Sequence, residues 1–166
     1  MGKRRKSREC ALQLLFELEF NPGDRPSLVR RYWSEQKAGA EVREYGTWLV
    51  DQVLDHRDEI DGLIQAASEH WRLARMAAVD RNILRIAVCE LLHEPSLVPA
   101  IVIDEAIEIA RKYSGGEAAV FVNGILDAVR KNTGRAGPSA KKKAGEGNHE
   151  QEAGRQTRKS RSPGSR

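Results

Sequence analysis

Apolar residues recur at intervals of three and four along most of the chain, up to about residue 131. This spacing places them on one face of an α-helix, and the alternation typical of β-strands occurs nowhere over a useful length. Clusters rich in proline and glycine, such as NPGDRP at residues 21–26, divide the pattern into segments. The predicted helices span approximately residues 6–20, 27–38, 41–56, 58–70, 77–92, 99–113 and 117–131. The pattern therefore predicts an all-α fold of about seven helices packed against one another.

The last two predicted helices contain the clearest punctuation. Pro99 suits the first turn of the sixth helix, and Gly115-Gly116 is better explained as the end of that helix than as a phosphate-binding loop. Apolar residues surround much of the sixth helix, which predicts a place near the centre of the domain. The Asn123-Gly124 pair inside the seventh helix is unusual, because glycine in a helix interior costs about 1 kcal/mol relative to alanine. We therefore expect this pair to serve something other than helix stability.

The apolar pattern stops before the end of the chain. No Val, Ile, Leu, Met, Phe, Trp, Tyr or Cys follows Val129. A segment with nothing apolar to bury cannot offset the entropy that ordering would cost. We therefore expect a helical domain at residues 1–132 and a disordered, basic, low-complexity tail at residues 133–166.

The net charge of +4 hides an uneven distribution. Residues 1–8 hold five basic residues and no acid, and residues 133–166 hold nine basic residues and three glutamates. The intervening residues 9–132 hold 14 basic and 21 acidic residues, so the body of the domain is acidic. A protein that bound nucleic acid over its whole surface would be cationic throughout. The distribution instead indicates a local phosphate contact at the N-terminal end.

The remaining composition argues against catalysis. Cys10 and Cys89 both lie on helical patterns and are expected to be buried thiols rather than a disulfide. The four histidines lack metal-ligand spacing, and no nucleophile–base arrangement is present. We therefore expect no enzyme activity, no cofactor and no metal. No apolar run reaches the roughly 18 residues of a membrane span, and no signal peptide is visible, so we expect a cytoplasmic protein without a membrane contact.

The first predicted helix combines basic and aromatic residues in a way that suits RNA. Five basic residues crowd its N-terminal end: Lys3, Arg4, Arg5, Lys6 and Arg8. They repel one another and the positive end of the helix dipole, and a phosphate would relieve both repulsions, although a solvated helix end is the alternative. Phe16 lies off the main apolar stripe of this helix. It either packs in the core or stacks on an unpaired base.

Two carboxylates of the fifth predicted helix, Asp80 and Glu90, fall on its apolar side. A buried carboxylate is costly unless it has a partner. For Glu90 we expect a structural ion pair with an arginine such as Arg85 or Arg81. Asp80 opens the helix.

Three blocks of the sequence resemble the NusB family of bacterial transcription antitermination factors. They are RRKSRECALQLLF at residues 4–16, AVDRNILRIAVCEL at residues 78–91 and IDEAIEIARKYSGGEAAVFVNGILD at residues 103–127. The blocks follow the order of the family and make the resemblance specific. It implies a fold of two packed helical subdomains and a non-enzymatic RNA-binding function.

The resemblance also implies roles for individual residues. The arginine-rich motif of the first helix would contact RNA phosphates, and Phe16 and Phe121 would stack on bases. Asn123 would make polar contacts or hold the final helix in place. Glu117 would lie at the RNA-contacting surface, although an acid in the first turn of a helix also has an ordinary structural explanation. Asp80 would lie near the contact with NusE, a small ribosomal-subunit protein.

The implied partners are a NusE-type ribosomal protein, a boxA-like single-stranded leader RNA and the RNA polymerase antitermination complex. The assembly would suppress termination, notably in ribosomal RNA operons. Two alternatives remain open: a NusB-like homodimer that has lost RNA binding, and a non-catalytic subunit of an RNA-modifying enzyme. RNA cytosine methyltransferases carry a NusB-like domain, which motivates the second alternative. The basic tail is either a solvated extension or a source of non-specific RNA affinity.

Overall fold

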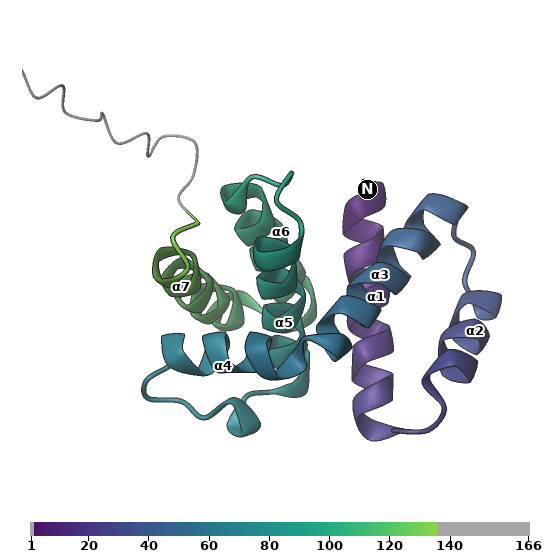
Figure 1. The fold of residues 1–166 in the computed structure, drawn as a ribbon, viewed down its shortest axis with the longest axis horizontal. Helices are drawn as coiled ribbons and strands as arrows, with labels where there is room; N and C mark the ends of the chain where they lie inside the picture. Colours follow the sequence, from purple (N-terminus) through teal and green to yellow (C-terminus); the bar gives the residue numbers. More distant parts are fainter. Residues whose placement is uncertain (1, 136–166) are drawn as a thin grey trace, which may run out of the picture.

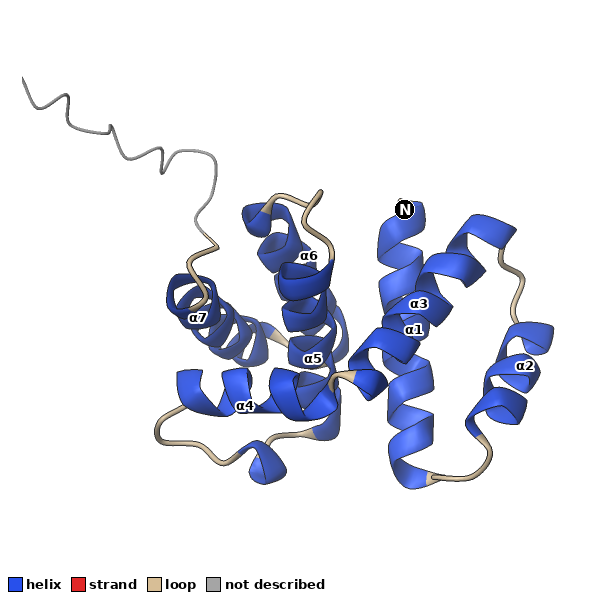
Figure 2. Ribbon diagram, in the orientation of Figure 1, coloured by secondary structure: helices blue, strands red, loops and turns tan. Residues whose placement is uncertain are grey.

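The computed structural model describes residues 2–135, and within this range every regular element is a helix (Figure 2). Most of the predicted tail lies outside the described residues. The elements are α1 (Lys3–Phe20), α2 (Arg25–Glu35), α3 (Ala40–Asp55), α4 (Arg57–Ala67), the short 3₁₀ helix η1 (Leu73–Arg75), α5 (Ala78–His93), α6 (Pro99–Tyr113) and α7 (Gly116–Asn132). The prediction of an all-α fold with seven helices is confirmed.

The predicted helix boundaries differ from the observed ones by at most three residues, and the larger differences have local causes. The helix α1 begins three residues earlier than predicted, and in its first turn the Lys3 ammonium lies 2.6 Å from the Glu41 carboxylate of α3. Helix α4 ends at Ala67, three residues before its predicted end, because the chain turns there. The Ser68 hydroxyl donates a hydrogen bond of 2.9 Å to the carbonyl of Trp71. Trp71 therefore lies on the link between α4 and η1.

The helices form two packed groups, as the prediction of two subdomains requires. Figure 1 shows α1, α2 and α3 on one side of the molecule and α4, α6 and α7 on the other, with α5 between them. Helix α5 packs against α1, α3, α4, α6 and α7, and every residue from Asn82 to Leu91 is buried. The sequence pattern predicts that the sixth helix lies near the centre, but the helix that contacts both groups is α5. Helix α6 packs mainly on α5 and α7 and leaves Ile101 half-exposed.

Two glycines inside helices should respond to alanine in opposite directions. Gly124 of α7 is exposed, and a Cβ built there meets no other atom within 4 Å. Because alanine favours helix by about 1 kcal/mol, we predict that Gly124→Ala raises the free energy of unfolding by up to that amount. In Gly46→Ala the new Cβ would lie 2.9 Å from the buried ring of Trp33, so this variant should lose stability. Urea unfolding of both variants measures the difference, and a destabilised Gly124→Ala would contradict the prediction.

Candidate nucleic-acid interface

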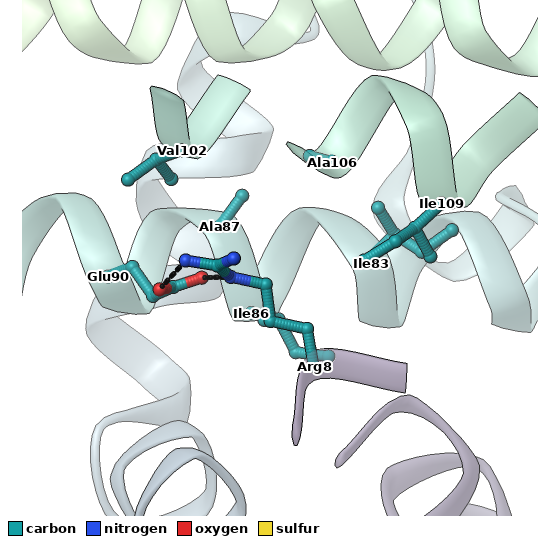
Figure 3. A pocket seen from close by; sticks show the side chains of 8 residues that line it. All are labelled: Arg8, Ile83, Ile86, Ala87, Glu90, Val102, Ala106 and Ile109. Carbon is teal, nitrogen blue, oxygen red and sulfur yellow. Dashed lines mark hydrogen bonds and ion pairs between the residues drawn. The ribbon is translucent and has the colours of Figure 1, made fainter. Parts of the chain in front are cut away.

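Arg8 of α1 is buried, with 4% of its surface exposed. Its guanidinium donates two hydrogen bonds, of 2.7 and 2.9 Å, to the carboxylate of Glu90 on α5 (Figure 3). The hydroxyl of Tyr45 on α3 donates a third hydrogen bond, of 2.6 Å, to the same carboxylate. Burial and the neighbouring Glu90 raise the pKa of Tyr45 above its ordinary value, which keeps this donor protonated. The prediction that Arg8 offers its charge to phosphate is therefore wrong for the free protein.

The ion pair predicted for Glu90 is present, but its partner was misjudged. Arg8 takes this role instead of Arg85 or Arg81. Arg85 donates to Asp61 of α4 at 2.7 Å, and Arg81 pairs with a glutamate of α1. Arg85 thus ties α5 to α4, and Arg81, like Arg8, ties α5 to α1.

Lys3 and Arg4 turn towards α3 rather than towards open solvent. The Arg4 guanidinium lies 3.6 Å from the ring centroid of Tyr45, which itself stacks on Trp48 with centroids 5.4 Å apart. A cleft of about 410 Å³ opens here. It is lined by Lys3, Arg4, Glu41, Glu44, Tyr45, Trp48 and Glu94. Three carboxylates against two cations make this cleft a poor place for a phosphate.

Arg5 faces α6, and Lys6 lies about 100° around the helix from Arg5. Lys6 is exposed and forms no ion pair within residues 2–135, whereas Arg5 donates two hydrogen bonds to a glutamate of α6. Further along α1, Phe16 and Phe20 are 39% and 61% exposed, with ring centroids 4.8 Å apart. The sequence left open whether Phe16 packs in the core or is available for stacking. Phe16 is exposed, so it is not a core residue. The side of α1 that carries Arg5 thus presents a cation near its start and aromatic rings near its end.

Asp80, Glu117 and Phe121 come together in a second cleft, of about 560 Å³, although they belong to two separate sequence blocks. The lining residues are Trp71, Arg75, Met76, Ala77, Asp80, Ser114, Glu117, Ala118 and Phe121. We call this the aromatic cleft. Asn123 is exposed on α7 but does not line it.

Trp71 is the most exposed aromatic residue of this cleft, and the sequence pattern does not single it out. Trp71 is 54% exposed. It belongs to the link between α4 and η1, so it is not part of any apolar stripe that the sequence predicts. The sequence does carry a signal for Trp71. It is an aromatic residue in a polar link, where it does not fit the helical spacing of the apolar residues. Phe121 is half-buried and packs against the core while it lines the cleft.

The charges of the aromatic cleft favour a nucleobase over a phosphate. Asp80 and Glu117 contribute two carboxylates against the single guanidinium of Arg75. The Oδ1 atom of Asp80 is buried and has no hydrogen-bond partner in the described part of the chain. Carboxylates accept hydrogen bonds from base N–H groups, and aromatic rings stack on base faces. The cleft therefore suits an unpaired base whose phosphates stay outside.

Lys112 of α6 forms an ion pair with α1. Its ammonium lies 2.9 Å from the carboxylate of Glu9, and Lys112 precedes the cleft residue Ser114 by two positions. The sequence did not single out Lys112. The side chain is half-exposed, and its charge is paired with the buried Glu9.

Other chemistry finds no support in residues 2–135. This range contains no group of three or more side chains able to hold a metal ion, and no helix in it is long and apolar enough to cross a membrane. Both cysteines are buried, as predicted, and burial raises the pKa of Cys89 to about 12. Such a thiol is unreactive at neutral pH.

Comparison with known families gives a match over most of the chain. The model of the NusB family matches residues 5–131. The transcription antitermination protein NusB of Sorangium cellulosum is 42% identical over 135 residues, which cover 81% of this chain and 96% of that protein. The protein of the same description from Koribacter versatilis is 44% identical over 129 residues, covering 77% and 88%.

Solved structures with a similar fold include NusB proteins. The structure of T. maritima NusB superposes with a TM-score of 0.71 at 35% identity, covering 77% of this chain and 90% of that one. A chain in the crystal structure of antitermination factors NusB and NusE in complex with dsRNA gives a TM-score of 0.71 at 30% identity. This second match covers 80% of this chain and 98% of that chain.

Proposed function

The chain belongs to the NusB family, and from this premise we propose that it binds RNA together with a NusE-type ribosomal protein as a transcription antitermination factor. Two curated relatives are described as transcription antitermination proteins, which are not enzymes, in agreement with the lack of a catalytic arrangement in the sequence. A similar solved structure contains NusB and NusE in complex with double-stranded RNA.

One observation carries this proposal: α1 presents exposed basic and aromatic side chains, and a separate cleft presents Trp71 and Phe121. Lys6 and Arg5 would hold phosphates, and Phe16 would stack on a base. Phe121 and Trp71 would receive a further base in the cleft. Bases must be unpaired to enter such a cleft, so we propose a single-stranded, boxA-like leader as the preferred RNA.

The remaining assignments concern the larger assembly. We place the NusE-type partner near Asp80, whose buried oxygen atom lacks a partner among residues 2–135. Bound to RNA polymerase in the cytoplasm, the protein, its partner and the RNA would suppress termination, notably in ribosomal RNA operons. Asn123 and Glu117, both exposed on α7, would add polar contacts to RNA or to the partner.

The salt dependence of RNA binding tests the role of α1. For a single strand, the slope of log affinity against log salt is about −0.7 per phosphate neutralised. Replacing Arg5 and Lys6 with alanine should flatten this slope by about 0.7 to 1.4. Fluorescence anisotropy with a boxA-like oligonucleotide at several salt concentrations measures it.

The matched control replaces Lys3 and Arg4 with alanine. This pair removes the same charge from the same helix, but its side chains face the carboxylates of α3. We expect a smaller change in slope than for Arg5 and Lys6. An equal change would show that only net charge matters. A stable dimer that RNA does not dissociate, observed by light scattering, would favour the homodimer alternative instead.

A further inference from the structure

Glu105 of α6 lies between two arginines of α1. The Nε and Nη2 atoms of Arg5 donate hydrogen bonds of 2.7 and 2.9 Å to its two carboxylate oxygens. The Nη1 atom of Arg8 lies 3.6 Å from one of the same oxygens. Because Arg8 commits its Nε and Nη2 atoms to Glu90, Nη1 is the part of its guanidinium that remains for Glu105.

The contact between Arg5 and Glu105 uses the donors that an RNA phosphate would require. Arginine binds carboxylate and phosphate in the same way, through two parallel N–H groups. The Arg5 side chain is 35% exposed and that of Glu105 is 23% exposed, so solvent and ligands reach the pair. The hydrogen bond from Arg5 lowers the pKa of Glu105, which keeps the carboxylate charged at neutral pH. In the free protein, Glu105 thus occupies the place of a phosphate.

We propose that Glu105 is an internal competitor for RNA phosphate, which holds Arg5 in the free protein and releases it when RNA binds. This inference rests on the proposed RNA-binding function. After the exchange, Arg8 keeps a positive charge beside the freed carboxylate. The buried arginine therefore acts in RNA binding as a positioning residue, without touching RNA.

The exchange has a cost that Arg8 reduces. Glu9 and Glu108 also interact electrostatically with Arg5. When the Arg5 side chain moves away to bind RNA, Glu105 is left among other carboxylates. A carboxylate without a nearby cation among other carboxylates is unfavourable. Because the guanidinium of Arg8 is fixed by Glu90, it stays in place while Arg5 moves. Only a ligand that offers Arg5 a comparably strong anionic contact completes the exchange.

A purely structural role for Glu105 predicts the opposite result. If the carboxylate merely orients Arg5 towards RNA, its removal would disorder Arg5 and weaken RNA binding. If Glu105 competes with phosphate, its removal strengthens binding. The sign of the change therefore separates the two roles.

The experiment measures RNA affinity by fluorescence anisotropy for the full chain and three variants: Glu105→Gln, Arg5→Ala and the double variant. The probe is a single-stranded, boxA-like oligonucleotide. Glu105→Gln should bind about fivefold more tightly than the wild type, which is the upper range for loss of one exposed ion pair. In the Arg5→Ala background the same substitution should give no such gain, because no Arg5 remains to be released.

Two further variants separate competition from net charge. Glu108→Gln removes one charge from the same helix near Arg5 and is the matched control, so only the excess gain of Glu105→Gln counts. Glu105→Asp keeps the charge but shortens the side chain, and it should also bind RNA more tightly than the wild type. Circular dichroism verifies that each variant is folded.

Specific outcomes would overturn the proposal. They are weaker binding by Glu105→Gln, a gain no larger than that of Glu108→Gln, or a gain that persists without Arg5. In each case the wild type still binds RNA, and the proposed function stands. Absence of salt-dependent binding by the wild type would overturn the proposed function as well, so the two failures are distinguishable.

Discussion

Replacing Arg8 with alanine is expected to lower the free energy of unfolding by about 3–5 kcal/mol, the range for a buried ion pair that loses one partner. The carboxylate of Glu90 is 1% exposed and would lose both of its hydrogen bonds from the guanidinium. Tyr45 alone cannot compensate a buried negative charge. The truncated side chain would also leave a cavity between α1, α5 and α6, where apolar groups surround the pair (Figure 3). Urea unfolding followed by circular dichroism measures the loss.

A volume-matched double substitution provides the control. Replacing both Arg8 and Glu90 with methionine removes the two charges together and fills most of the space, so it should recover much of the lost stability. The hydroxyl of Tyr45 would still lose its acceptor, which costs about 1–3 kcal/mol when the group is buried. A loss below about 1 kcal/mol for Arg8→Ala would contradict the structural role assigned to this arginine.

Replacing Trp71 with alanine is expected to weaken binding of a single-stranded RNA by about 1–3 kcal/mol, which is the contribution of one stacked base. This loss corresponds to roughly a 5- to 150-fold increase in Kd. Trp71 is 54% exposed on a link, so the substitution should leave the helices intact. Phe121 is a less clean target because it also packs against the core. Anisotropy with the same oligonucleotide, alone and annealed to its complement, provides the measurement.

Val120→Ala is the matched control for Trp71. Val120 is 74% exposed and precedes Phe121 on α7, but it does not line the aromatic cleft. Its substitution should leave RNA affinity unchanged. If Trp71→Ala also binds RNA as the wild type does, the aromatic cleft is not a base-binding site. The RNA-binding role would then depend on α1 alone.

The sequence predicts the helices well because burial of a helix face leaves a periodic record. It contained a signal for Arg8 too: this residue precedes Ala11 by three positions, Leu12 by four and Leu15 by seven, and all three are buried. That spacing places Arg8 on the inner side of α1. Its membership in a basic cluster outweighed this signal, so the residue was assigned to RNA.

Partner choice and clefts were harder to predict because they depend on tertiary packing. The burial of Glu90 was visible in the spacing of α5, but three arginines were available and only the packing of α1 on α5 selects Arg8. The aromatic cleft combines a link with the ends of two helices. The spacing of apolar residues within a helix does not indicate which separate segments come together. The central place of α5 rather than α6 likewise follows from how the two subdomains face each other.

Glu90 receives hydrogen bonds from α1 and α3, which belong to one subdomain, while its own helix packs against the other. Partly separating the two halves would break these hydrogen bonds before water can reach the carboxylate, which would leave an ionised group buried without a partner. Half-open intermediates are penalised for this reason, even though each half has its own apolar contacts. A single deep polar contact thus confers cooperativity on a molecule built from two small bundles.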